Sequence, residues 1–151
     1  MIENKDVCRE AIKGKRIMGV DFGFKRVGLA VADELGITVT PKVTLDFENP
    51  NFWDKLLDFI KAERIKACVV GVPYRNDNEK TAVIEAIEIF CNKLKLLSKL
   101  DVFVHDESYT SIDAGETMIE IGKKKKKRSE KGEKDKIAAA IILKDFINQY
   151  L

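Results

Sequence analysis

Cysteine is scarce in this sequence of 151 residues, and long apolar runs are missing from it. Cys8, Cys68 and Cys91 are odd in number, widely spaced and outside any Cys-x-x-Cys or His-linked pattern, which argues against a disulfide framework and a zinc site. No apolar run is long enough to cross a bilayer, and the first residues lack the hydrophobic stretch of a secretory signal. We therefore expect a cytoplasmic protein with free thiols and no membrane partner.

The composition is that of an ordinary globular protein. Hydrophobic residues make up 45% of the chain and charged residues 34%, a balance that needs neither metal nor disulfides to hold a core. A chain of this length can bury most of its apolar surface around a single core. We therefore expect residues 1–151 to form one domain.

The small net charge of +2 conceals an uneven distribution. Nine Lys or Arg and three Asp or Glu between Lys123 and Lys136 give that segment a charge of +6 and leave −4 for the rest of the chain. Such asymmetry indicates a polyanionic partner at one face. The stretch Lys123–Gly132 has no apolar residue, so we expect it to be a mobile basic loop.

Short apolar runs between turn residues predict the strands of the first half. The runs Ile17–Val20 and Val27–Val31 predict a β-hairpin. Alternation of apolar residues between Gly36 and Leu45 predicts a third antiparallel strand, and Pro41 places it at a sheet edge or at a bulge.

The second half of the chain alternates between strands and helices. The continuous apolar run Cys68–Pro73 predicts a central parallel strand, and Asp101–His105 predicts another short strand parallel to it. The whole order predicts an α/β fold with a mixed five-stranded sheet, a three-stranded antiparallel meander plus two parallel strands, and helices on both faces. The predicted helices are a short lead-in before Lys15, one from a cap at Asn49 to Glu63, Glu79–Leu97, one from Thr110 or Ser111 to Gly122, and Glu133–Tyr150.

Three acidic residues stand where packing alone would not favour them. Asp21 follows the first strand, Glu107 follows the last strand, and Asp135 opens the last helix. Carboxylates gathered at one sheet edge are hard ligands that favour Mg²⁺ or Mn²⁺. Each also has a plain alternative: Asp21 can cap the turn after it, Asp135 can complement the helix dipole, and Glu107 with Asp106 can be loop acids in water.

Other polar residues near these strand ends have two interpretations each. The basic residues from Lys123 to Arg128 are placed to contact phosphates, which gives affinity without sequence choice. Lys25 and Arg26, in the turn of the hairpin, either touch the substrate or are simply solvated. His105 is the only histidine, and we expect it to serve packing or a hydrogen bond rather than proton transfer.

Four segments resemble motifs of the YqgF family, the ribonuclease H-like proteins also called RuvX. Gly19–Asp33 resembles the opening motif of the family, and Val69–Pro73 resembles its central-strand motif ending in Gly-Leu-Pro. Asp106–Ser111 is similar to its Asp-Glu-Arg-x-Ser/Thr-Thr motif, and Asp135–Leu143 is similar to its Asp-x-x-Ala-Ala-x-x-Ile-Leu motif. The four segments follow one another in the family's order and span nearly the whole chain.

The resemblance implies a ribonuclease H-like fold and a metal-dependent nuclease. It makes Asp21, Glu107 and Asp135 the metal-binding and catalytic acids, with Mg²⁺ or Mn²⁺ as the cofactor and a two-metal-ion mechanism. The implied role is processing of the 5′ end of pre-16S ribosomal RNA. Two alternatives stay open: resolution of branched DNA by a symmetric dimer, and non-catalytic binding of ribosome precursors. The chain is expected to be a monomer or a homodimer.

The sequence departs from the family pattern near the expected substrate. Ser108 replaces an Arg, Asn78 replaces a Gly, and Arg75 replaces an Asn. The change at Ser108 removes a bidentate phosphate donor, and Arg75 could supply the missing charge. The expected nucleic-acid-binding residues are Lys25, Arg26, Arg75, Lys123, Lys124, Lys125, Lys126, Lys127 and Arg128.

Overall fold

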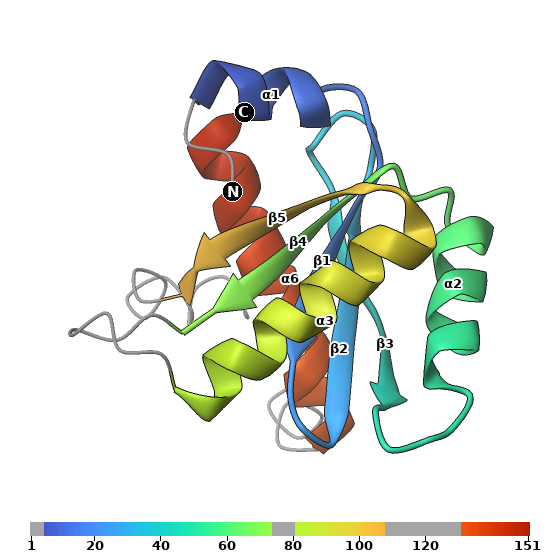
Figure 1. Cartoon of the computed structure of the whole chain (residues 1–151). Coiled ribbons are helices and arrows are strands. Elements are labelled where there is room, and N and C mark those ends of the chain that lie inside the picture. Colours follow the sequence, from blue (N-terminus) through green and yellow to red (C-terminus); the bar gives the residue numbers. More distant parts are fainter. Residues whose placement is uncertain (1–4, 74–80, 108–130) are drawn as a thin grey trace.

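The strands form a mixed sheet in the order β3-β2-β1-β4-β5 (Figure 1). This computed structural model describes residues 5–73, 81–107 and 131–151. Three predicted features lie outside the described residues: the helix ending at Gly122, Arg75, and residues 123–130 of the basic loop. The strands are β1 (Ile17–Phe22), β2 (Arg26–Ala32), β3 (Val39–Asp46), β4 (Ala67–Val72) and β5 (Asp101–Asp106).

Strand pairing confirms the predicted meander plus two parallel strands. β2 pairs antiparallel with both β1 and β3, whereas β4 pairs parallel with both β1 and β5. β3 is an edge strand, and its register shifts opposite Leu29 and Ala30, where Pro41 pairs with Ala30. Both expectations for a proline without an N–H donor, an edge position and an irregular ladder, are therefore confirmed.

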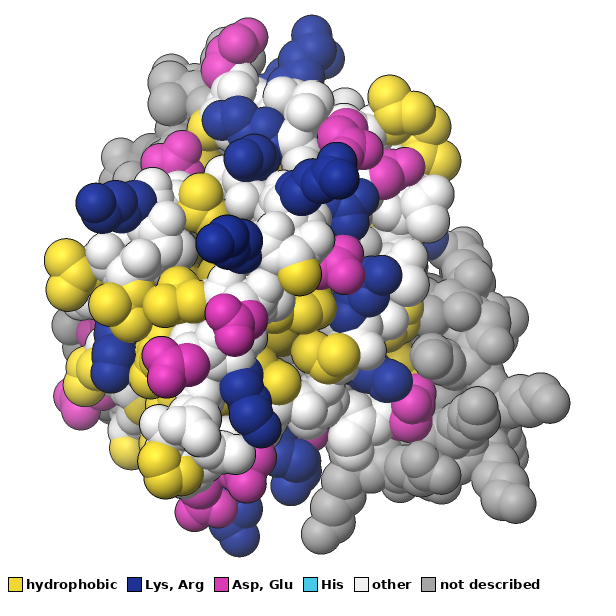
Figure 2. Space-filling view, turned by 90° about the vertical axis from the view of Figure 1, so that its right-hand side faces the viewer, with side chains coloured by type: hydrophobic (Ala, Val, Ile, Leu, Met, Phe, Trp, Pro, Cys, Tyr) yellow, Lys and Arg dark blue, Asp and Glu magenta, His cyan; other side chains and the backbone are white. Residues whose placement is uncertain are grey.

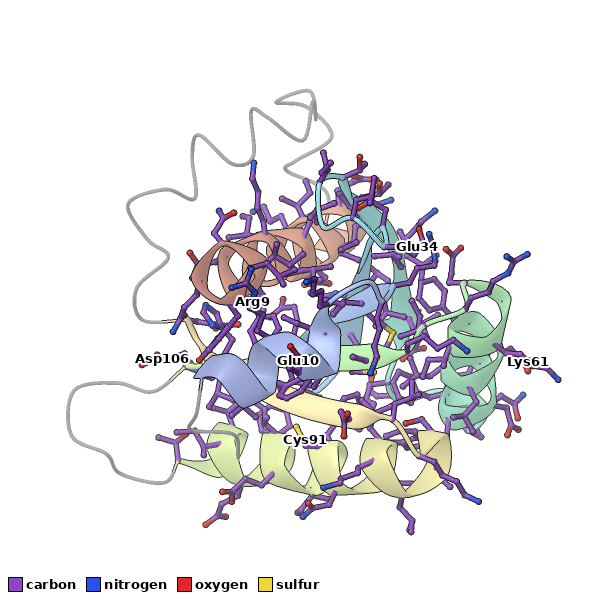
Figure 3. The ribbon with its side chains drawn as sticks, turned by 90° about the horizontal axis from the view of Figure 1, so that it is seen from above. Arg9, Glu10, Glu34, Lys61, Cys91 and Asp106 are labelled. Carbon is purple, nitrogen blue, oxygen red and sulfur yellow. The ribbon has the colours of Figure 1, made fainter. Side chains whose placement is uncertain are left out.

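Helices cover both faces of the sheet, as predicted. Seen from above, the sheet lies between α6 on one side and α3 on the other, with α2 beside α3 and α1 near α6 (Figure 3). None of the helices in the described part of the chain combines the length and apolar character needed to cross a bilayer. The helices are α1 (Lys5–Ile12), α2 (Phe52–Ala62), α3 (Ala82–Ser98) and α6 (Lys131–Tyr150).

Alternation along β1 divides the core into two clusters. Met18 and Val20 belong to the cluster that contains the buried side chains of α2 and α3. Ile17 belongs to the second cluster, which contains the buried side chains of α6. Because successive side chains of a strand point to opposite faces, the odd-numbered positions of β1, including Asp21, face α6.

Three helix starts differ from the prediction. α3 begins at Ala82 rather than at Glu79, because the Thr81 side chain caps it by accepting from the Ile84 amide at 3.3 Å.

The start of α2 also differs. Asn49 does not cap α2, since Asn51 is the N-cap and the Asn49 side chain instead accepts a hydrogen bond from the Asn51 amide at 2.8 Å. This extra turn lets the helix begin at Phe52, whose ring is buried.

α6 begins at Lys131, so the last two residues of the predicted mobile loop are helical. The Thr44 hydroxyl donates to the Gly132 carbonyl at 2.5 Å and ties this first turn to β3. Lys136 also pairs with Glu133 at 2.8 Å, one turn apart on the helix. Tertiary contacts therefore extend the helix beyond what its apolar periodicity predicts.

Candidate functional site

Asp21 lies inside β1, one residue before the strand ends, rather than after the strand as the sequence suggested. It pairs with Gly28 of β2. The next odd-numbered residue toward the start of the strand is Gly19, where a Cβ would lie 2.7 Å from the Ala139 carbonyl of α6. The same alternation directs the Asp21 side chain toward α6 and away from the turn that it could have capped.

Asp135 reaches this region because α6 approaches the sheet at backbone distance. A Cβ on Gly28 would lie only 2.1 Å from the Asp135 carbonyl oxygen, so the helix rests on the strand at a residue without a side chain. Gly28 is the strand partner of Asp21. Small residues on both sides, including the buried Ala139 and Ala140 of α6, permit this contact.

Glu107 follows directly after β5 and reaches across β4. A Cβ on Gly71 of β4 would lie 2.3 Å from the Glu107 Oε1 atom, so the carboxylate occupies the space above that glycine. Gly71 comes one residue after Val70, which pairs with Val20 of β1. The Glu107 carboxylate is therefore directed from the sheet edge toward the strand that carries Asp21.

The three carboxylates share one electrostatic environment. Burial, followed by the negative charges of Glu107 and Asp135, raises the pKa of Asp21 from 3.8 to about 7. Burial, followed by the charge of Asp106, also raises the pKa of Glu107. Desolvation and like charge disfavour the ionised form together, which is typical of sites that bind a cation or move a proton.

Arg26 pairs with Asp135 in the structure, whereas the sequence suggested contact with the nucleic acid. Its Nε donates to Asp135 Oδ2 at 2.6 Å, with the two side chains 40% and 20% exposed. Arg26 opens β2 rather than lying in the turn, and it shares the face of Gly28 two residues later. The even-numbered positions of Arg26 and Gly28 in one strand were the signal in the sequence that could have predicted the Arg26–Asp135 pair.

His105 connects β5 to α6 close to Glu107. Its Nε2 lies 2.5 Å from Asp145 Oδ2, and the imidazole is only 6% exposed. Its ring also meets Phe146 edge-on at 6.0 Å between centroids. The histidine therefore combines packing with a hydrogen bond, the roles expected for it, and Asp145 is the partner that the sequence did not reveal.

The donor atoms suit a hard cation, although the side chains do not stand in a ligand arrangement. In the stretches 5–73, 81–107 and 131–151, no three His, Cys, Asp or Glu side chains are arranged to hold a metal ion. All three carboxylates nevertheless offer only oxygen, the donor that Mg²⁺ and Mn²⁺ prefer. The raised pKa of Asp21 also indicates negative charge that a cation would offset.

Only two of the predicted nucleic-acid-binding residues, Lys25 and Arg26, are among the described residues. Lys25 is exposed in the turn between β1 and β2, and its carbonyl accepts from the Phe47 amide at 2.8 Å. Arg26 lies beside it and pairs with Asp135. The remaining predicted contacts, Arg75, Lys123, Lys124, Lys125, Lys126, Lys127 and Arg128, lie outside the described residues.

Comparison with known proteins finds one family and several similar proteins. Residues 15–149 match the RuvX family, described as "Holliday junction resolvase". A protein of Amoebophilus asiaticus named "Putative pre-16S rRNA nuclease" is 39% identical over 89% of this chain and 95% of its own length. A protein of the same name from Endomicrobium trichonymphae is 34% identical over 88% of this chain and 95% of its own length.

A solved structure shares the fold at low sequence identity. RuvC of T. thermophilus, solved in complex with a Holliday junction substrate, superposes with a TM-score of 0.57 and 13% identity. The match covers 88% of this chain and 93% of that one. This similarity confirms the predicted ribonuclease H-like fold, with helices packed on a mixed five-stranded sheet.

Proposed function

The chain belongs to the RuvX family, and we propose that it is a metal-dependent nuclease that hydrolyses phosphodiester bonds of pre-16S ribosomal RNA during maturation of the 5′ end. The observation that carries this proposal is the coupling of Asp21, Glu107 and Asp135. Three elements far apart in sequence bring these carboxylates to one end of the sheet, where burial and then the charges of Glu107 and Asp135 raise the pKa of Asp21. An acid with only a structural role costs less free energy on the surface, where water stabilises its charge.

The three carboxylates share one role in this proposal. Asp21, Glu107 and Asp135 would hold Mg²⁺ or Mn²⁺, which in such sites supplies an activated water and offsets charge on the phosphodiester. Gly28 and Gly71 leave the space that Asp135 and Glu107 occupy.

Two contacts fix the carboxylates on either side of Asp21. Arg26 fixes Asp135 Oδ2 at the start of α6. The His105–Asp145 contact fixes the end of β5, two residues before Glu107. The chain therefore orients both carboxylates from packed elements rather than from loops alone.

RNA is favoured as the substrate by the names of the relatives. Proteins 34–39% identical to nearly this whole chain are named for pre-16S rRNA. Lys25 and Arg26 place positive charge at the end of β1, beside the acids, and the sequence adds the basic stretch 123–128. These cations offset the repulsion that the carboxylates exert on a polyanion.

Resolution of a four-way DNA junction is the second candidate. It is favoured by the description of the RuvX family and by the shared fold of RuvC, which was solved with such a junction. The chemistry at the carboxylates would be the same. Symmetric cutting of two strands would additionally require two copies of the chain.

A cleavage assay tests both candidates. A labelled precursor 16S RNA fragment and a four-way DNA junction are each incubated with the full chain in Mg²⁺, in Mn²⁺ or in chelator. We expect cleavage of the RNA with either metal, no cleavage in chelator, and loss of activity in Asp21→Asn. Asp58→Asn, an exposed acid on α2, is the matched control and should cleave normally.

The possible results separate the functions. Cleavage of the junction with intact RNA would favour the resolvase. Binding of RNA without cleavage under any metal condition would favour a non-catalytic binding factor. Equal activity of Asp21→Asn and the parent protein would reject the carboxylate site itself.

A further inference from the structure

Phe24 is an exposed aromatic residue at the same end of the sheet as the carboxylates. It lies in the turn between β1 and β2, and 57% of its surface is open to solvent. It stands three positions after Asp21, so the two Cα atoms are at most ~11 Å apart by the reach of the chain. A ligand group on Phe24 would therefore lie at the end of the sheet that carries the carboxylates, on the side of α2 and α3 to which Phe22 belongs, whereas Asp21 faces α6.

The turn that carries Phe24 is held firmly on both sides. The Phe24 ring meets the ring of Phe22 edge-on, at 6.0 Å between centroids and an interplanar angle of 72°. Phe22 is 8% exposed and belongs to the core. The Lys25 carbonyl accepts from the Phe47 amide at 2.8 Å. An aromatic ring held in this way loses little conformational entropy when a ligand binds to it.

Lys25 supplies positive charge next to Phe24. It follows Phe24 in the turn, and Arg26 opens β2; both line a shallow pocket that also contains the acids Asp46 and Glu48. Arg26 is engaged with Asp135, whereas Lys25 is exposed and forms no ion pair with any described residue. An aromatic surface next to an available lysine is the combination that binds a base and its phosphate in single-stranded nucleic acids.

The exposed apolar residues at the opposite end of the sheet lack this setting. Leu35 and Ile37 are 76% and 77% exposed in the connection between β2 and β3. Their neighbours Asp33 and Glu34 are acidic, and neither side chain is aromatic. Isolated exposed apolar residues of this kind need no functional explanation.

We propose that Phe24 is a stacking platform for one unpaired base of the substrate RNA, with Lys25 on the adjoining phosphate. The inference rests on the proposed function for the identity of the ligand, and it adds that the substrate is single-stranded where it crosses the end of the sheet that carries the carboxylates. A base inside a duplex is covered on both faces by its neighbours and cannot stack on the ring. Phe24 therefore selects single-stranded RNA over duplex RNA.

Binding measured without cleavage tests this proposal. A short fluorescent single-stranded RNA is titrated with the full chain in chelator, and anisotropy gives the Kd. We expect Phe24→Ala to weaken binding by about 5- to 100-fold, the range for loss of one stacked base. Phe24→Trp should bind at least as well as the parent protein. Leu35→Ala, the matched control, should leave the Kd unchanged.

A second measurement separates stacking from a general loss of structure. A series of RNAs, each lacking one base at a different position, is titrated with the parent protein and with Phe24→Ala. If the ring stacks on a base, removing the base at one position weakens RNA binding by the parent protein. The same removal does not weaken binding by Phe24→Ala any further. Duplex RNA should bind equally to both proteins.

The outcomes separate this inference from the proposed function. If Phe24→Ala binds single-stranded RNA within twofold of the parent protein, the stacking platform is wrong even if the RNA is cleaved. An equal loss for every missing-base RNA and for duplex RNA also overturns it. If the position-specific loss is found and no cleavage occurs with any metal, the platform stands and the nuclease proposal fails.

Discussion

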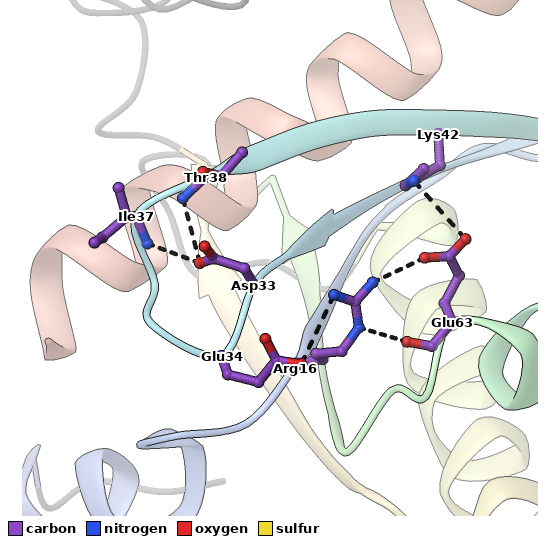
Figure 4. Close-up of polar contacts among 7 residues, drawn as sticks. All are labelled: Arg16, Asp33, Glu34, Ile37, Thr38, Lys42 and Glu63. Atoms are coloured by element: carbon purple, nitrogen blue, oxygen red, sulfur yellow. Dashed lines mark hydrogen bonds and ion pairs between the residues drawn. The ribbon is translucent and has the colours of Figure 1, made fainter.

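The two ends of strand β1 differ in how their charges are compensated. At the start of the strand, the Arg16 guanidinium donates to the Glu63 carbonyl at 2.6 Å and to its carboxylate at 2.9 Å (Figure 4). Lys42 approaches the same carboxylate at 3.8 Å. At the other end, Asp21 is buried beside Glu107 and Asp135 and carries a raised pKa. The first end is balanced, and the second holds excess negative charge.

The connection between β2 and β3, at the balanced end, also compensates its acidic charge. The Asp33 carboxylate accepts from the amides of Ile37 and Thr38, so its charge closes a turn (Figure 4). Acidic and basic side chains also mix over the face on the α2 side of the molecule (Figure 2). The excess of carboxylates at the end of β1 is therefore a local feature, and it indicates a site kept for a ligand at some expense in stability.

The largest expected effect is on cleavage. Asp21→Asn should lower the rate of RNA cleavage in Mg²⁺ by about 10³-fold or more, because several kcal/mol of charge stabilisation in the transition state are lost. Arg16→Ala, at the balanced end, should cleave at the parent rate under conditions where both are folded. Single-turnover rates with saturating enzyme measure the difference. Equal losses in both variants would mean that the two ends do not differ in function.

The next effect is on stability: Asp21→Asn should stabilise the protein although it lowers the rate of cleavage. Because the pKa of Asp21 is raised from 3.8 to about 7 in the folded protein, the folded state binds more protons than the unfolded state between these values. Stability of the parent protein in chelator should therefore fall as the pH rises from 4 to 7 and then stay level. Asp21→Asn removes this loss and should be more stable above pH 7 by up to about 4 kcal/mol.

Urea unfolding at a series of pH values measures this difference. The gain of Asp21→Asn over the parent protein should shrink as the pH falls and vanish near pH 4, where the carboxyl group is protonated in both states. Asp58→Asn should show no such trend. A difference that stays the same at every pH would mean that Asp21 ionises in the folded protein at no cost.

Close packing of α6 on the sheet gives the third prediction. Gly28→Ala should destabilise the protein by about 2–3 kcal/mol, because the new Cβ would lie 2.1 Å from the backbone of Asp135. Gly132→Ala in α6 is the matched control, since its Cβ would have ordinary contacts at 3.9 Å. That change should be neutral or stabilising in a helix. Chemical denaturation that finds the two variants equally stable would contradict this contact.

The smallest expected effect is at the balanced end. Arg16→Ala should cost about 1–2 kcal/mol of unfolding free energy, because it removes two partly buried hydrogen bonds to Glu63. Arg16→Lys keeps the charge without the forked geometry and should recover only part of this loss. An unchanged denaturation midpoint for Arg16→Ala would show that the Arg16–Glu63 contact contributes nothing to stability.

The sheet could be predicted from the sequence because local patterns determine most of it. Alternation, apolar runs and Pro41 were sufficient for the strand order and the edge position of β3. The starts of α2 and α6 were not predicted, since they depend on Phe52 reaching the core and on Thr44 binding Gly132. Such contacts join residues far apart in the chain and leave no local signal.

The same reasoning explains what was predicted at the site. Parallel strands end at one edge, so strand order alone predicts that Asp21 and Glu107 lie at the same end of the sheet. The approach of Asp135 through Gly28 and its pairing with Arg26 depend on how closely α6 packs. The sequence indicated small residues on that helix, but it could not specify which strand residue the helix touches.

Calorimetric titration of Mn²⁺ into the parent protein and into Asp21→Asn at pH 8 tests the central claim most directly. If the carboxylate end is kept for a cation, the parent protein binds Mn²⁺, the variant loses that binding, and Arg16→Ala retains it. Equal binding by the parent protein and Asp21→Asn, or no binding by either, would contradict the account.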